Sequence, residues 1–159
     1  MPVLSDIDIR RLVNKRRIEI RPFNEQSLTP NGYDLAIGEI LVPRLNKHIR
    51  EGQVNVPDLT WFVIGTKEYI RLPPKVCGQL WIRSSWARIG VISAFGKVDS
   101  GFEGTLTLSA FNASSKELKV PIGATFAQIS FETLSSRPKF LYGEKRNRYQ
   151  KQRGITLHK

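Results

Sequence analysis

Two short stretches of the sequence concentrate side chains that could do chemistry on an anion. The first is Arg83-Ser84-Ser85 with Arg88, which follows the apolar run Leu80-Trp81-Ile82. Two guanidiniums and two hydroxyls this close together can donate several hydrogen bonds to one anionic ligand, and the planar guanidinium suits phosphate in particular. The same residue types are also typical of a helix start flanked by solvated arginines, so this cluster alone leaves both interpretations open.

The second stretch is the glycine-rich segment 96–104, GKVDSGFEG, which carries Asp99. Its glycines allow positive φ and close backbone approach, so the pattern predicts a tight hairpin that presents Asp99 and main-chain amides to a ligand. An aspartate beside a bound polyphosphate could orient and deprotonate a water for hydrolysis at phosphorus. The structural alternative is a turn aspartate that bonds its own backbone.

The composition predicts one globular domain, residues 1–159. Hydrophobic residues make up 40% of the chain and charged residues 25%, which is an ordinary balance for a chain that buries one sizeable core. The single cysteine, Cys77, excludes an internal disulfide, and with only two histidines the sequence offers no Cys/His cluster for zinc. Neither a membrane-length apolar run nor a signal peptide is visible, so we expect a cytoplasmic protein without a membrane partner.

Positive charge is concentrated near the end of the chain. The net charge is +11, and the segment 137–159 holds eight lysines and arginines against one acid, Glu144. Such a balance favours an anionic partner. The segment could be a solvated end, a nucleic-acid arm or a lid over bound phosphates.

The elements that must position these residues are mostly strands. Short runs of β-branched and aromatic residues alternate with Gly, Pro and Asn turns, which predicts an antiparallel sandwich or barrel. Helices are expected at residues 6–15, where Ser5 caps an amphipathic pattern, and in a short segment around 86–90. In the motif-bearing part, strands are expected at 106–111, 118–120 and 126–131.

Five ordered motifs resemble those of the trimeric dUTP pyrophosphatase and dCTP deaminase family, over nearly the whole chain. In sequence order they are Asn31-Gly32-Tyr33-Asp34-Leu35, Arg83-Ser84-Ser85-x-x-Arg88, Gly96-x-Val98-Asp99-x-x-Phe102-x-Gly104, Phe126-Ala127-Gln128-Ile129 and Tyr149-Gln150-Lys151-Gln152-Arg153-Gly154. The last motif is more similar to the tail of the deaminase branch than to the Gly-rich tail of ordinary dUTP pyrophosphatases. The resemblance implies a mostly β, distorted jelly-roll-like barrel or sandwich with one or two short helices. It also implies a homotrimer with sites at the subunit interfaces.

The resemblance leaves the reaction to be decided, because its two branches share a pocket but differ in chemistry. In the deaminase branch, a glutamate on the strand after the carboxylate turn handles protons at the cytosine ring, and the resemblance places Ser109 at that position. A serine hydroxyl cannot replace a tuned carboxylate in proton transfer. Asp99, which the pyrophosphatase branch uses as its base, is present. We therefore expect hydrolysis of dUTP to dUMP and pyrophosphate, which removes dUTP and supplies dUMP for thymidylate synthesis.

Two other functions stay open. The chain could be a dCTP deaminase, bifunctional or not, in which another carboxylate such as Glu103 replaces the missing glutamate. It could also be a non-catalytic relative that binds nucleotides or, through its basic tail, nucleic acid. Nucleic acid is not the partner we expect.

The resemblance also implies roles for individual residues. Asp99 would activate water while Arg83 supports the leaving pyrophosphate. Mg²⁺ would be held mainly by the triphosphate, with Asp34 near the metal or bracing an arginine of the site. The implied phosphate ligands are Ser84, Ser85, Arg88 and Gln128. The implied base and sugar contacts are Lys97, Val98 and Phe102, the last at a position where the pyrophosphatase branch has tyrosine. Within the tail, residues 137–159, a lid over the nucleotide would be formed by Tyr149, Lys151, Gln152 and Arg153.

Overall fold

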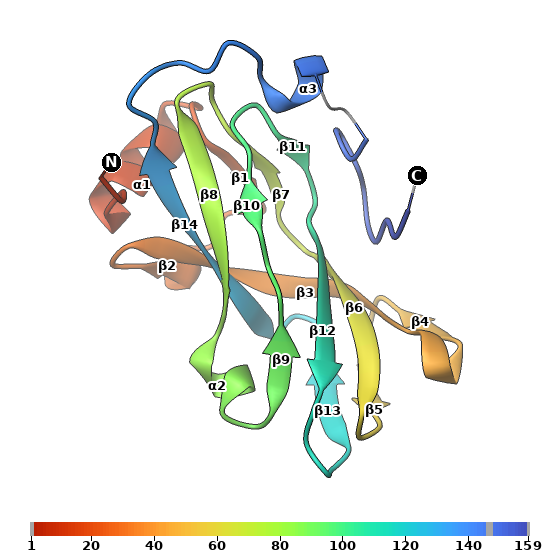
Figure 1. The fold of residues 1–159 in the computed structure, drawn as a ribbon. Helices are drawn as coiled ribbons and strands as arrows, with labels where there is room; N and C mark the ends of the chain where they lie inside the picture. The colour runs from red at the N-terminus through yellow and green to blue at the C-terminus, as the bar shows by residue number, and fades with distance from the viewer. Residues whose placement is uncertain (1, 146–147, 159) are drawn as a thin grey trace.

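The computed structural model describes residues 2–145 and 148–158, and its strands curl into a half-barrel (Figure 1). The main sheet contains β2 (Leu28–Thr29), β3 (Gly32–Val42), β4 (Lys47–Ile49), β6 (Thr60–Thr66), β8 (Val76–Ile82), β9 (Val91–Ser93), β10 (Lys97–Val98), β12 (Thr107–Asn112) and β14 (Thr125–Thr133). Two smaller sheets contain β1 (Glu19–Arg21), β7 (Tyr69–Arg71) and β11 (Glu103–Gly104), and β5 (Gln53–Val56) with β13 (Leu118–Pro121). The mostly β fold predicted from the sequence is confirmed.

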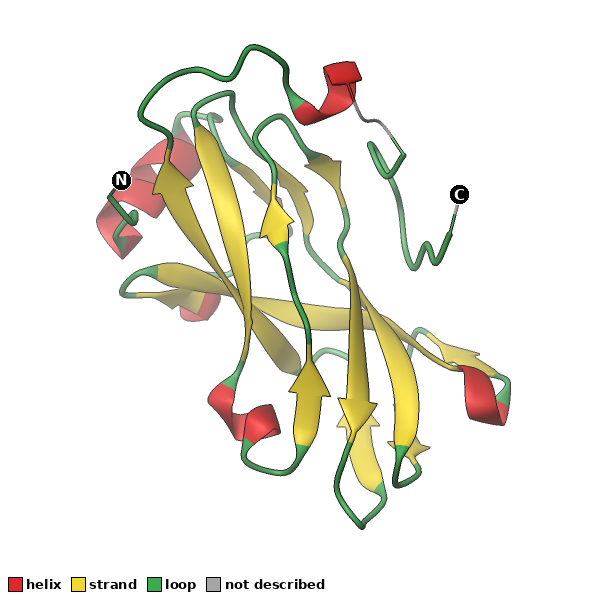
Figure 2. Cartoon of the chain, viewed as in Figure 1, coloured by secondary structure: helices red, strands yellow, loops and turns green. Residues whose placement is uncertain are grey.

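Helices are short and lie at the margins of the sheets (Figure 2). They are α1 (Asp6–Asn14), α2 (Ser84–Ala87), α3 (Tyr142–Lys145) and the single 3-10 turns η1 (Glu25–Ser27) and η2 (Pro43–Leu45). Helix α1 begins as predicted, because the Ser5 side chain accepts a hydrogen bond from the Asp8 amide. Helix α2 is one turn that starts two residues earlier than predicted, and α3 was not predicted. Within the described residues, no helix is long and apolar enough to cross a membrane.

Strand β3 is the structural axis of the half-barrel. Its first half pairs with β14 and its second half with β6, and nearly every residue along it is buried. The register shifts between Ile37 and Glu39, and a Cβ on the intervening Gly38 would lie 2.9 Å from the backbone of Lys67. A glycine at such a bulge lets one strand bend and change partners. In Figure 1, β3 therefore crosses behind the long strands of both halves.

The glycine-rich segment 96–104 does not form the predicted hairpin. Strand β10 pairs with β8 in the main sheet, whereas β11 pairs with β7 in the three-stranded sheet. Between them the Phe102 amide donates to the Asp99 carbonyl at 3.1 Å, and Gly101 adopts φ +83°. This is a tight turn that requires a residue tolerant of positive φ, and it links two sheets rather than two strands of one sheet. The prediction was wrong because each two-residue strand finds a longer neighbour elsewhere.

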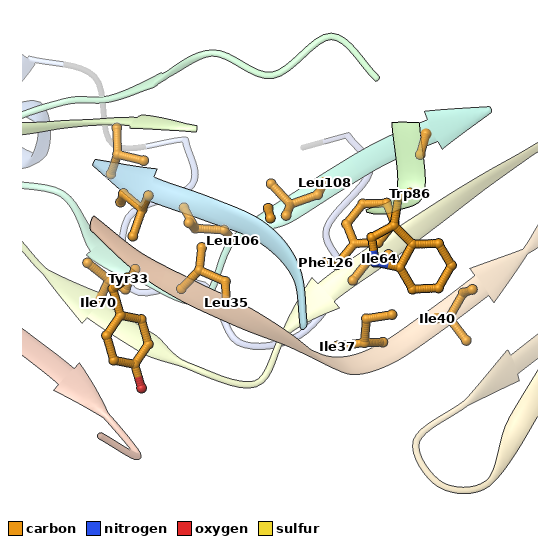
Figure 3. Close-up of a cluster of buried hydrophobic side chains, with 14 of the residues drawn as sticks. Tyr33, Leu35, Ile37, Ile40, Ile64, Ile70, Trp86, Leu106, Leu108 and Phe126 are labelled. Carbon is orange, nitrogen blue, oxygen red and sulfur yellow. The ribbon is translucent and has the colours of Figure 1, made fainter. Parts of the chain in front are cut away.

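Helix α2 is fixed to the main sheet by a buried tryptophan, Trp86. Trp86 of α2 packs against Phe126 of β14 with ring centroids 5.3 Å apart, and its indole nitrogen donates to the Thr125 carbonyl at 2.8 Å (Figure 3). Phe126 also contacts Phe62 of β6 edge-on. Burying these aromatic rings contributes about 2–3 kcal/mol each. The one-turn helix that carries the Arg-Ser cluster is therefore held by a large apolar side chain.

Candidate functional site

A pocket of about 490 Å³ opens between β12 and the segment that leads into β10. Its walls are largely apolar and include Val63, Leu80, Phe95, Val98, Leu106 and Leu108. Its polar lining includes Lys97, Asp99, Thr107, Ser109, Tyr149 and Gln152. A cavity of this size, with apolar walls and polar groups that converge on it, is typical of a small-molecule site.

Asp99 stands at the rim of this pocket in the turn between β10 and β11. Its side chain is exposed and makes no ion pair with any described residue. Among the residues that line the pocket it is the one carboxylate. A second hollow, of about 460 Å³, also borders Asp99 together with Cys77 and Ser100. Solvent can therefore reach this carboxylate from both hollows.

Phe102 closes one side of the pocket with a buried aromatic plane. It is 6% exposed and packs edge-on against Tyr142 of α3, with ring centroids 5.5 Å apart. Sequence reasoning missed Tyr142, as well as Thr156 and Leu157, all of which line the pocket. The only signal for them was the presence of aromatic and aliphatic side chains within a strongly basic tail.

The tail runs along β11 and the start of β12 of its own chain. The Lys151 amide donates to the Glu103 carbonyl at 2.6 Å, and the Thr105 amide donates to the Gln152 carbonyl at 3.1 Å. Gly104 and Gln152 form a parallel bridge. These contacts hold the tail against the edge of β11 through one isolated bridge. Arg146 and Lys159 of the predicted basic tail lie outside the described residues.

The four predicted lid residues divide into two pairs. Tyr149 and Gln152 line the pocket, whereas Lys151 and Arg153 do not. The Arg153 guanidinium instead lies 4.0 Å from the centre of the Tyr69 ring, which is a cation–π contact. The chain turns between these residues, since Lys151 has φ +57° and the Gln152 amide donates to the Tyr149 carbonyl at 3.3 Å, so Tyr149 and Gln152 reach the pocket while Lys151 does not.

Gln152 presents an unsatisfied acceptor at the pocket. Its Nε2 donates to the Thr105 carbonyl at 2.6 Å, so the amide oxygen must face the other way. That Oε1 atom is buried and has no hydrogen-bond partner among the described residues. An orphaned buried acceptor costs about 1–3 kcal/mol, so it is best explained by a ligand or water that donates to it.

The Arg-Ser cluster is organised by Asp34 of β3. The Arg83 Nη1 atom lies 2.5 Å from the Asp34 carboxylate and 2.5 Å from the Thr125 hydroxyl. Gln128 of β14 donates to Asp34 at 3.3 Å. Asp34 is 7% exposed, and hydrogen-bonding and ionic partners offset the cost of burying its carboxylate. Asp34 is therefore ion-paired with an arginine of the cluster, and its predicted place near a metal stays a prediction.

The cluster and the Asp99 turn lie at opposite ends of the chain's half-barrel. In Figure 1, α2 is at the bottom of the molecule, while the loop from β10 to β11, α3 and the tail are at the top. Ser84, Ser85 and Arg88 are exposed, and none of the cluster residues lines the pocket at Asp99. Within one chain, the predicted phosphate ligands and the predicted base are not brought together.

Glu103, the alternative proton carrier, faces away from the pocket. It accepts a hydrogen bond of 2.5 Å from the Tyr69 hydroxyl and is not among the lining residues. Burial and this hydrogen bond raise the pKa of Tyr69 to about 12. Glu103 is thus committed to the β7–β11 contact.

The described residues contain no group of three or more His, Cys, Asp or Glu side chains that could hold a metal ion. Asp99 is a lone carboxylate at the pocket, and Asp34 is already bonded to Arg83. This donor set does not fit a cation chelated by the protein itself.

Comparisons with known proteins define the class and then the family. The structure of 2'-deoxycytidine 5'-triphosphate deaminase from Agrobacterium tumefaciens superposes with a TM-score of 0.69 at 17% identity, over 81% of this chain and 47% of that one, which shows a shared fold. A family model described as dCTP deaminase-like matches residues 46–134. The dCTP deaminase of Pyrococcus abyssi is 40% identical, covering 91% of this chain and 94% of its own length. A protein of Sulfolobus islandicus rod-shaped virus 1 named "Probable deoxyuridine 5'-triphosphate nucleotidohydrolase" is 34% identical, covering 99% and 98%. The chain belongs to the dCTP deaminase-like family.

Proposed function

We propose that this protein hydrolyses dUTP to dUMP and pyrophosphate, with Asp99 as the general base. The observation that carries the proposal is the composition of the pocket, in whose lining Asp99 is the one carboxylate. The lining also includes Ser109, at the position where the family resemblance implies a glutamate in the deaminase branch. A pocket with this lining has a base for activating water but no second carboxyl for moving protons on a pyrimidine ring. The related viral nucleotidohydrolase supports the same activity.

In the proposed reaction, Asp99 accepts a proton from water as the water oxygen attacks the α-phosphorus. The bond from the α-phosphorus to the bridging oxygen breaks, and pyrophosphate leaves with the electron pair. Mg²⁺ bound to the triphosphate would offset the charge of the leaving group. Arg83 and Arg88 would hold the same phosphates through planar, charge-assisted hydrogen bonds, with Ser84 and Ser85 as further donors.

Because the two halves of the site lie far apart in one chain, we propose that a homotrimer assembles them at its interfaces. The cluster is flanked by Trp81, Ile89 and Ile92, which are 60%, 50% and 61% exposed. Large apolar side chains exposed together around a polar cluster are typical of a surface that another subunit covers. The cluster of one subunit would then meet the Asp99 pocket of a neighbour.

Selection of the nucleoside would fall to the pocket residues. The buried plane of Phe102 could lie under the sugar and leave no room for a 2'-hydroxyl, so deoxyribose would be preferred. Lys97 and Val98 would contact the base or sugar from β10. The free Oε1 atom of Gln152 suits a donor on the base, such as the imide N–H of uracil. The same atom would also accept from the exocyclic amine of cytosine, so Gln152 by itself does not choose between them.

A second candidate, deamination of dCTP, is favoured by the names of relatives and by the deaminase-like tail motif. The Pyrococcus abyssi relative is called dCTP deaminase. This candidate needs a proton carrier in place of Ser109, and Glu103 is held by Tyr69 outside the pocket. A bifunctional enzyme would release both ammonia and pyrophosphate from dCTP.

The experiment that separates these functions offers dUTP, dCTP and dTTP individually with Mg²⁺ and identifies every product. We expect dUMP and pyrophosphate from dUTP, and no ammonia from dCTP. In ¹⁸O-labelled water the label should appear in dUMP, because attack is at the α-phosphorus. Ammonia from dCTP without turnover of dUTP would establish the deaminase instead, and label in pyrophosphate would refute the mechanism.

A further inference from the structure

We propose that Glu39 is a positioning residue that anchors the end of the tail beside the pocket. The inference rests on the proposed function for what the pocket holds, whereas the anchoring can be tested without any nucleotide. Glu39 lies on β3, close to the point where that strand changes partners. It lies outside every motif that marked the site in the sequence.

Both oxygens of the Glu39 carboxylate are engaged. Oε1 accepts a hydrogen bond from the Ile155 amide of the tail at 2.6 Å. Oε2 accepts from Arg50 Nε at 3.2 Å and lies 2.5 Å from His48 Nε2. The residue is only 5% exposed, and a buried carboxylate that accepts several hydrogen bonds is held in one position. Glu39 thus joins β3, the tail, and β4 with the residue that follows it, Arg50, through one side chain.

Two glycines leave the space that this carboxylate occupies. A Cβ on Gly65 of β6 would lie 2.8 Å from Glu39 Cγ, and a Cβ on Gly154 of the tail would clash with Glu39 Oε1. Gly154 also has φ +69°, a conformation in which a side chain is strained. The tail can therefore approach Glu39 closely because both Gly65 on the sheet and Gly154 on the tail lack a side chain there.

The anchor lies within the part of the tail that borders the pocket. Gln152 precedes the Ile155 contact and lines the pocket, and Thr156 and Leu157 follow it and also line the pocket. The Thr156 amide donates to the Thr107 hydroxyl at 3.0 Å, which continues the same path along β12. Without the Glu39 carboxylate, the Ile155 amide would lose its acceptor between these lining residues. The fraction of molecules whose tail lies beside the pocket, ready for ligand binding, should then fall.

The anchor is tested first by proteolysis of the full chain without nucleotide. Glu39→Ala removes the acceptor from the barrel side, and Gly154→Ala disturbs the same contact from the tail side. Trypsin should cleave after the exposed Lys151 and Arg153 about tenfold faster in both variants, because cleavage follows the population of the released tail. Glu39→Gln keeps an acceptor for the Ile155 amide and should stay close to the wild-type rate.

Gly52→Ala is the matched control. Gly52 has φ +74°, close to that of Gly154, but a Cβ there meets nothing within 4 Å. The control therefore adds the same backbone strain without touching the tail, and its cleavage rate should equal that of the wild type. Cleavage of both Glu39→Ala and Gly154→Ala at the wild-type rate would overturn the proposal. Gly154→Ala answers the question even if Glu39→Ala unfolds.

Kinetics with dUTP then separate positioning from simple structural damage. A released tail lowers the fraction of binding-competent protein, so KM should rise about tenfold while kcat stays within about twofold. The double variant should be no worse than the worse single variant, because both changes break one contact. A fall in kcat at unchanged KM would overturn the positioning role. If the wild type fails to hydrolyse dUTP, the proposed function fails, and the trypsin result still decides the anchor.

Discussion

The Asp99 pocket and the Arg-Ser cluster differ in how far one chain completes them. The pocket is enclosed by strands, by the buried ring of Phe102 and by the tail, and it holds an acceptor without a partner at Gln152. The cluster sits on a one-turn helix with Ser84, Ser85 and Arg88 open to solvent. One end of the molecule is therefore shaped for a ligand, while the other presents donors without a cavity of their own.

This difference suggests a division of labour between subunits. In the proposed function, recognition of a nucleoside needs shape and exclusion of water, and a single chain would supply both by packing its tail along β11. Binding a triphosphate needs several cationic groups and hydrogen-bond donors directed at the same phosphates, and in the proposed trimer a neighbouring subunit would supply them. Within one chain, the ion pair between Asp34 and Arg83 keeps one guanidinium of the cluster ordered before any ligand binds. The predictions below test each half separately, from the largest expected effect to the smallest.

The largest effect is expected at the pocket end. Asp99→Asn keeps the shape of the turn but removes the base, so kcat for dUTP should fall about a thousandfold. Binding of dUTP, followed by calorimetry, should change little because Asp99 does not hold the phosphates. A variant that retains the full turnover rate would refute the assignment of the base.

The cluster end can be tested by complementation. Arg88→Ala should lower kcat/KM for dUTP by roughly a hundredfold, because a desolvated guanidinium to phosphate contact is lost. Arg88 is exposed and makes no ion pair with a described residue, so the fold should survive.

Mixing that variant with Asp99→Asn sharpens the comparison. If one site combines the pocket of one subunit with the cluster of another, random assortment restores about one site in four. Unfolding and refolding the two inactive proteins together should then give activity that neither has alone. The absence of any recovery in verified mixed oligomers would show that the two halves do not share a site across chains.

A smaller effect is expected when the brace is weakened. Asp34→Asn removes the ion pair with Arg83 but keeps an acceptor, so affinity for dUTP should fall about tenfold. Affinity for dUMP, which lacks the two outer phosphates, should be nearly unchanged if the cluster serves only those phosphates. Calorimetric titration with both nucleotides gives the comparison, and an equal loss for both would contradict it.

The smallest effect on activity is expected at Glu68, a buried residue between β6 and β7 that belongs neither to the pocket nor to the Arg-Ser cluster. Burial raises the pKa of Glu68 from 4.5 to about 7, even though its carboxylate accepts from the Ala36 amide at 2.9 Å. A raised pKa means that the folded protein binds the proton more tightly, so this contribution to stability is full below pH 4.5 and is lost as pH rises through 7.

Glu68→Gln should remove this loss of stability at high pH, because the amide does not ionise. Near pH 8 the variant should be more stable by up to about 3 kcal/mol, while below pH 4.5 the two proteins should differ little. Denaturant unfolding across this range measures the difference, and kcat for dUTP at one pH serves as the control for the site. A stability difference that does not vary with pH would contradict the role of the buried carboxyl.

Local patterns predicted most of the elements because their causes are local. Ser5 caps α1, and alternating side chains place β12 and β14 where the strands were expected. The glycine-rich segment was misread because the conformation of its turn is local, whereas the choice of pairing partner is not. The one-turn α3 was not predicted, since four residues in a polar tail carry no periodic signal.

For the site, the sequence by itself determined the chemical groups: one aspartate in a turn, two arginines with two serines, and a serine at the position where the family resemblance implies a glutamate. These depend on residue type and spacing, which a linear chain carries in full. Only the tertiary structure decided that Asp34 braces Arg83, that Glu103 turns to Tyr69, and that the tail packs along β11 beside Glu39. Those contacts join residues far apart in the chain, and they are set by which strands the core brings side by side.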